Sequence, residues 1–289
     1  MLLYSQQIKP PVFMKKILFS LTALILLTSC SDDDTESITN QGPQLVKMKS
    51  ISYYNNVIEG YSIYDYSNEH PFRLTSYNGR NEVISYHIYS YNSDGLLVSI
   101  KNYNSDNTQA GISDYIYDAN GRISSSNNNS SDYTGSTIYT YNNDNTITGI
   151  TTTNTHTATK TYYTNNDNLI YKEIDNNNNF FEIVFDGFNP VSSRGTYSSP
   201  VSYEYMDSPT PPANYYQENV FGSYKPNAAL FDTSVEDHEL DYATKYEKKE
   251  IRSGSVTEFE YVFNDAQLPI NVKEYRNGTL EGEREYTYE

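Results

Sequence analysis

The sequence predicts an all-β fold, an antiparallel meander of repeated β-hairpins that forms one large curled or partly closed sheet, with a Pro-rich insertion. Three observations support this prediction. Aromatic residues make up 15% of the chain, with 31 Tyr and no Trp, and aromatic residues favour half-buried pleated surfaces. A short unit of two aromatics, a polar turn and an apolar residue recurs along the chain. Several segments also alternate polar and apolar residues with the period of a strand.

The repeated unit is clearest at residues 89–96 and 115–123, and weaker copies follow at 139–147 and 162–170. Their second aromatics, at positions 91, 117, 141 and 163, are 26, 24 and 22 residues apart, which leaves room for one hairpin per unit. Asn and Gly tolerate the left-handed backbone that such turns need. We therefore expect positive φ at Gly95, Gly121, Asn145 and Asn168.

Alternation in the last part of the chain predicts strands with one apolar face. Thr257, Phe259, Tyr261 and Phe263 fall on one side, and Tyr286 and Tyr288 repeat the pattern at the C-terminus. Residues 83–91 are apolar on both sides instead, which predicts that both faces of that strand are covered.

The repeat is interrupted between residues 206 and 245. Pro209, Pro211, Pro212 and Pro226 exclude central strands there, and the composition allows a short helix near 235–245. The insertion serves either as a binding excursion or as a cap on the sheet. Its aromatics could stack on sugar rings or pack on the sheet; they are Tyr215, Tyr216, Phe221 and Tyr224.

The N-terminal segment, residues 1–29, has the features of a signal peptide preceded by an upstream extension. Met14-Lys15-Lys16 supplies a charged start and residues 17–27 an apolar stretch. We expect Met14 to be the true first residue. The apolar stretch is shorter than the roughly 20 residues that span a bilayer.

The residues at the end of this segment, Leu27-Thr28-Ser29-Cys30, resemble the lipobox of bacterial lipoproteins. The resemblance implies cleavage before Cys30 and lipidation of that cysteine. It also accounts for the only cysteine in the chain, which cannot form an internal disulfide.

An acidic run, Ser31-Asp32-Asp33-Asp34, follows the cysteine and resembles the export signal of surface lipoproteins of the Bacteroidetes. The resemblance implies the outer leaflet of the outer membrane and display at the cell surface. Polar residues 30–43 otherwise predict a disordered tether, followed by a single β-repeat domain over 44–289.

The unit at 115–123, Tyr-Ile-Tyr-Asp-Ala-Asn-Gly-Arg-Ile, resembles the YD repeat of RHS-type proteins. The other copies lose the Asp, Gly or Arg of that pattern. This resemblance implies an extended antiparallel sheet that curls into a wall, and it brings no catalytic residues.

The net charge and the absence of catalytic and metal-binding motifs limit the functions that the sequence supports. Removing residues 1–29 takes away three lysines and no acid, leaving 17 bases against 37 acids, a net charge of −20. Such a charge argues against a nucleic-acid partner. The four histidines have no metal-ligand spacing and no catalytic motif is present, so we predict no enzyme, cofactor or metal site.

The sequence favours a membrane-anchored binding or structural module whose partner is a glycan or a protein. Two alternatives stay open. One is a secreted glycan-active hydrolase, because 37 acids can bring two carboxylates together. The other is an envelope scaffold that faces the periplasm.

Overall fold

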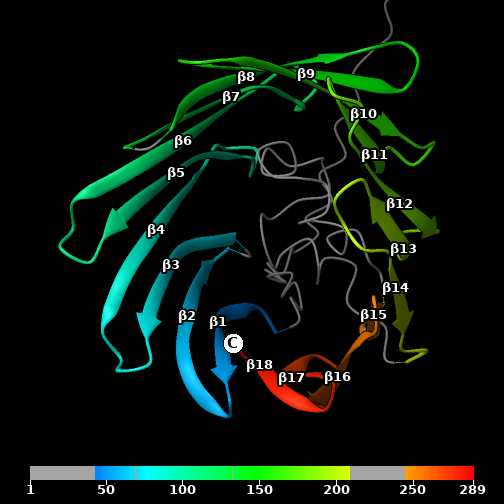
Figure 1. The fold of residues 1–289 in the computed structure, drawn as a ribbon. Coiled ribbons are helices and arrows are strands. Elements are labelled where there is room, and N and C mark those ends of the chain that lie inside the picture. Colours follow the sequence, from blue (N-terminus) through cyan, green and yellow to red (C-terminus); the bar gives the residue numbers. More distant parts are fainter. Residues whose placement is uncertain (1–42, 69, 132, 209–244) are drawn as a thin grey trace, which may run out of the picture. The chain divides into compact units, whose positions relative to one another are not determined.

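The computed structural model describes residues 43–289 except 69, 132 and 209–244, and these residues form eighteen antiparallel strands in one sheet (Figure 1). The strands are β1 (Leu45–Tyr54), β2 (Val57–Ser67), β3 (His70–Asn78), β4 (Val83–Tyr91), β5 (Leu97–Asn104), β6 (Gln109–Tyr117), β7 (Ile123–Ser130), β8 (Thr134–Tyr141), β9 (Thr146–Thr153), β10 (Thr157–Thr164), β11 (Ile170–Asp175), β12 (Phe180–Asp186), β13 (Asn189–Gly195), β14 (Val201–Tyr205), β15 (Glu247–Arg252), β16 (Ser255–Phe263), β17 (Pro269–Arg276) and β18 (Thr279–Tyr288). Each strand pairs with its neighbours in the sequence, so the predicted meander of hairpins is confirmed.

The sheet closes into a barrel, which corrects the prediction of a merely curled or partly closed sheet. Strand β18 pairs with β1 in register from Leu45↔Tyr288 to Ser52↔Gly282. This pairing removes the two free edges that an open sheet would expose. It joins residues more than 200 positions apart, and no local pattern marks two strands as partners over such a distance.

The turns after the aromatic pairs explain the recurring polar motif. In the first clear unit the Asn92 Oδ1 accepts backbone N–H groups of Asp94 at 3.0 Å and Leu96 at 2.9 Å. Asp118 and Asn165 make the same pair of bonds in their units, and Asn264 accepts the second of them, from the Leu268 N–H. The predicted positive φ angles are confirmed at Gly95, Gly121, Asn145 and Asn168, with values of 74°, 72°, 59° and 62°.

The unit at 115–123 uses its charged residues to join neighbouring hairpins. The Asp118 carboxylate accepts a bond from the Arg122 Nε at 2.8 Å. The Arg122 guanidinium also lies 4.1 Å from the centre of the Tyr141 ring in the next unit, a favourable cation–π distance. Asp and Arg therefore have structural roles in this unit.

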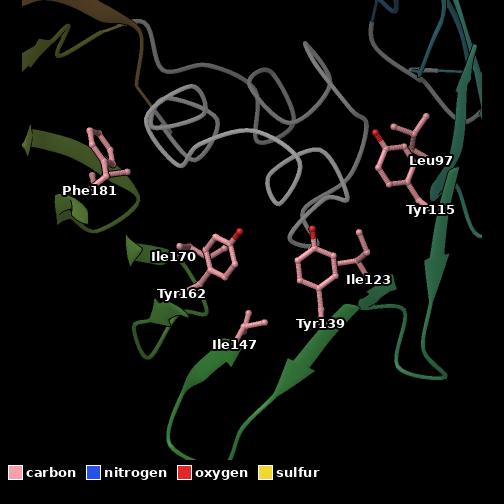
Figure 2. Packing of buried hydrophobic residues seen from close by; sticks show 9 residues of the cluster. Leu97, Tyr115, Ile123, Tyr139, Ile147, Tyr162, Ile170 and Phe181 are labelled. Carbon is pink, nitrogen blue, oxygen red and sulfur yellow. The ribbon is translucent and has the colours of Figure 1, made fainter. Parts of the chain in front are cut away.

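Residues that lie opposite each other in the register project from the same face of the sheet, and one face holds the core. Tyr115, Tyr139 and Tyr162 project from this face toward the inside of the ring of strands (Figure 2). Leu97, Ile123 and Ile170 complete the most deeply buried part of this cluster. A second buried cluster lies on the same face, with Leu45, Met48, Tyr66, Tyr246, Val272 and Tyr286. We call this face the inner wall and the opposite face the outer wall.

In most units a tyrosine before the turn ties its strand to the preceding hairpin; Tyr163 is the exception, since it lies on the outer wall beside Lys172. The Tyr117 hydroxyl donates to the Leu97 carbonyl at 2.7 Å, and Tyr141 donates to Ile123 at 2.9 Å. The same bond recurs from Tyr91 to Pro71, Tyr205 to Pro190, Tyr261 to Glu247 and Tyr288 to Pro269. These bonds explain why tyrosine, and not phenylalanine, dominates the second position.

Replacing Tyr117 by Phe should therefore lower the free energy of unfolding by about 1 kcal/mol, because the Leu97 carbonyl loses its donor while the ring stays in place. Urea denaturation followed by circular dichroism measures the loss. Tyr103→Phe on the outer wall is the matched control and should change stability by less than about 0.5 kcal/mol. Equal losses in the two variants would contradict a stabilising role for the bond.

The outer side of β4 is not fully covered, so the prediction that residues 83–91 are covered on both faces is wrong. Ile84 of β4 is 55% exposed. Tyr86 on the same wall stacks on Tyr103 of β5, with ring centres 4.7 Å apart. Cross-strand stacking, and not a second layer of the fold, accounts for the aromatic outer side of this strand.

Candidate functional site

The residues that the sequence predicts for anchoring, export and ligand stacking lie outside the described part of the chain. These are Leu27, Thr28, Ser29, Cys30, Ser31, Asp32, Asp33 and Asp34 near the N-terminus, and Tyr215, Tyr216, Phe221 and Tyr224 in the insertion. The expected helix near 235–245 also falls mostly outside. Strands β14 and β15 end and begin at Tyr205 and Glu247, close to the predicted limits of the insertion.

The barrel has two distinguishable ends, and the chain enters at one of them. Leu45, at the start of β1, pairs with Tyr288, at the end of β18. We call this end, which also carries the repeated Asx turns, the tether end. The opposite end carries the short hairpins such as the one between Tyr54 and Val57, and we call it the far end.

The inner wall changes character between these ends. Toward the tether end it is aromatic and aliphatic and almost fully buried. Toward the far end it carries small polar side chains, most of them partly exposed. We call this far half of the inner wall the mouth; its described polar residues include Ser50, Ser62, Ser76, Ser85, Asn102, Asn128, Ser130, Thr151 and Thr153.

Four serines form a continuous row across the mouth. Ser50 on β1 lies opposite Ser62 on β2, and the register continues through Ser76 on β3 to Ser85 on β4. The Ser62 and Ser76 hydroxyl oxygens are 3.1 Å apart. On the next strands Asn102 lies opposite His87 and Gly111, and burial lowers the pKa of His87, which favours its neutral imidazole.

Most charged side chains of the mouth are paired with one another. The Lys160 Nζ lies 3.2 Å from the Glu173 Oε1. Glu250 and Arg252 approach to 3.2 Å, and Glu274 and Arg284 to 3.7 Å. The three pairs add no net charge, and the Asp175 carboxylate, opposite Lys160 in the register, accepts bonds from Asn177 and Asn179.

Most tyrosines of the repeats are not available to a ligand from outside, because they face the buried part of the inner wall. Tyr163, on the outer wall, is the exception. The outer tyrosines are a different set. Tyr61 stacks on Tyr77 at 4.6 Å, with the Lys49 Nζ 5.0 Å from the Tyr61 ring. Tyr86 lies between Tyr103 and Arg73 in the same manner. Both stacks brace adjacent strands, which is a structural use of their ring faces.

The described residues contain no group of three or more His, Cys, Asp and Glu side chains that could hold a metal ion. Within the same residues, no helix is long and apolar enough to cross a membrane.

Comparison with known proteins finds no matching family model and no matching curated protein. Among solved structures, the chain is similar to a porin-like protein from Bacteroides uniformis. The two are 12% identical, the match covers 85% of this chain and 96% of that chain, and the TM-score is 0.45. A similarity this weak transfers no function.

Proposed function

We propose that the protein is a lipid-anchored, non-catalytic module displayed at the outer membrane, and that it binds a neutral glycan in the mouth. The main support for this proposal is the change along the inner wall from buried apolar side chains to partly exposed polar ones. A buried aromatic half holds the barrel together, whereas the polar half is partly open to solvent and serves no comparable core.

The outer wall supports a tethered barrel and not an inserted one. A lipid-facing barrel presents an apolar band about 25 Å tall, in which each Lys or Arg at the midplane costs about 2–4 kcal/mol. Here charged residues lie on the outer side of most strands, and several of them stand in the middle of their strand. One ladder runs Lys172↔Glu182↔Arg194 and another Glu204↔Lys249↔Glu258. These ladders suit a surface in water.

The mouth lies at the end of the barrel opposite Leu45, where β1 begins. The described chain therefore enters the barrel at the end away from the mouth.

The chemistry of the mouth favours a neutral, hydroxyl-rich ligand. Serine hydroxyls both donate and accept, and asparagine adds two donors and an acceptor. Because Lys160, Arg252 and Arg284 are each paired with an acid, an anionic ligand would have to break a pair such as Lys160–Glu173. The same pairing disfavours a hydrolase, since the Glu173, Glu250 and Glu274 carboxylates each lie within 4 Å of a base.

Neutral glycans on an array should bind the intact lipoprotein in detergent micelles, and Ser62→Leu with Ser76→Leu should weaken that binding at least tenfold. The two leucines remove a hydrogen-bonded hydroxyl pair from the row and place apolar groups against the sugar. Ser202→Leu on the outer wall is the matched control and should bind like the parent.

Circular dichroism confirms that each variant is folded. Uniformly flat arrays, or equal losses in the mouth and control variants, would refute glycan binding in the mouth. Protease shaving of intact cells separates display from a scaffold facing the periplasm, because a periplasmic domain would survive the protease.

A further inference from the structure

Four adjacent strands, β7 to β10, form an outer surface with no charged side chain. Strands β7, β8 and β9 contain no Asp, Glu, Lys or Arg at all, and the only one in β10 is Lys160. Lys160 lies on the inner wall, where it bonds Glu173. We call this surface the neutral face; its residues are Ser125, Asn127, Asn129, Ser136, Ile138, Thr140, Thr148, Ile150, Thr152, Thr157, Thr159 and Thr161.

The remainder of the outer wall differs sharply. Charged residues lie on the outer side of thirteen of its fourteen strands, β4 being the exception. They are Lys47 and Lys49 on β1, Asp65 on β2, Arg73 on β3, Lys101 on β5, Asp114 on β6, Lys172 on β11, Glu182 on β12, Arg194 on β13, Glu204 on β14, Lys249 on β15, Glu258 and Glu260 on β16, Lys273 on β17, and Glu283 and Glu285 on β18. A chain of net charge −17 thus leaves one continuous face uncharged.

Isoleucines mark the centre of the neutral face. Ile138 and Ile150 lie directly opposite each other on β8 and β9 and are 62% and 44% exposed. The same row continues through Ser125 to Ile116 on β6, which is 53% exposed. An apolar centre with a polar, uncharged rim is the composition of a protein contact surface.

We propose that the neutral face is the contact between two copies of this chain. Strongly acidic molecules repel each other wherever their charged surfaces meet, and the neutral face is the part of the described outer wall where two copies approach without that cost. A two-fold axis through the isoleucine row would pair the face with itself, as in most homodimers.

The area of the face sets the strength of the contact. Four strands about 4.8 Å apart, each offering about 20 Å of length, give roughly 400 Å² per copy and about 800 Å² in total. This lies below the roughly 1,200–2,000 Å² of stable specific interfaces, in the range of weak, transient contacts. Tethering to one membrane surface would raise the effective concentration and make a weak contact sufficient.

Disulfide cross-linking of the full-length lipoprotein on cells tests the proposal. Single cysteines are introduced as Thr140→Cys or Thr152→Cys on the neutral face, with Ser202→Cys on β14 as the matched control, and the parent chain reports any contribution of Cys30. Mild oxidation should give at least fivefold more homodimer from the neutral-face cysteines than from Ser202→Cys. Adding Ile138→Lys, or separately Ile150→Lys, should reduce that dimer at least fivefold.

Both lysine variants place the charge on an exposed side chain, and circular dichroism verifies their folding. Equal dimer from Ser202→Cys, monomer alone, or adducts with a different protein would overturn the proposal. None of these readouts depends on glycan binding in the mouth.

Discussion

Replacing Cys30 by Ala is expected to release the protein from membranes completely. The lipobox resemblance of Leu27-Thr28-Ser29-Cys30 makes the cysteine the lipid attachment point, and each buried CH₂ of an acyl chain contributes about 0.8 kcal/mol. Nothing on the charged outer wall replaces that contribution. Incorporation of a fatty-acid probe should be lost, and the protein should move from the membrane fraction to the soluble fraction.

Ser31→Ala is the matched control, since it keeps the cysteine and should keep both label and membrane fraction. Replacing Asp32, Asp33 and Asp34 together by Ala separates anchoring from export. That variant should still incorporate the probe but become resistant to protease shaving of intact cells. Continued labelling of Cys30→Ala would refute lipidation at this residue.

Local features of the fold were predictable because each rests on neighbouring residues. An aromatic pair, an Asx turn and an apolar residue define a hairpin, and the turn geometry around Gly121 and Asn145 follows from side chains within five positions. Closure was not predictable in this way. The register between β1 and β18 depends on pairs such as Lys49↔Glu285, whose partnership no periodicity reveals.

The second feature that the sequence does not predict is which face of each strand points into the barrel. Tyr86 and Tyr89 look equivalent in the sequence, yet Tyr86 braces the outer wall whereas Tyr89 packs against the inner core. The sequence alone does not tell which of these tyrosines faces outward. The serine row was missed because its members, such as Ser62 and Ser76, align only through the register. The neutral face did carry a signal, a run from 123 to 164 with few charges.

As the pH is raised, the barrel should unfold at a lower pH than an ordinary protein of its size, because its buried tyrosines must stay neutral in the folded state. Burial raises the pKa of Tyr66, Tyr89 and Tyr91 far above the ordinary value of 10.0, and neighbouring phenols add to the effect. The neutral forms are favoured in the folded state. Their contribution to stability is therefore complete below pH 10 and is lost as the pH rises above it.

Each of these three tyrosines should cost about 1.4 kcal/mol of stability per pH unit above 10, or about 4 kcal/mol together. A net stability of about 5–15 kcal/mol would then be exhausted within roughly one to four pH units. The part of the tyrosinate absorbance that comes from the buried phenols should rise together with the loss of the circular dichroism signal, because those phenols ionise only on unfolding. Tyr91→Phe should lower stability at neutral pH by about 1 kcal/mol through loss of its bond to the Pro71 carbonyl, yet flatten the decline above pH 10. Full tyrosinate absorbance near pH 10 in a protein that is still folded would show that the inner wall is open to hydroxide and not buried.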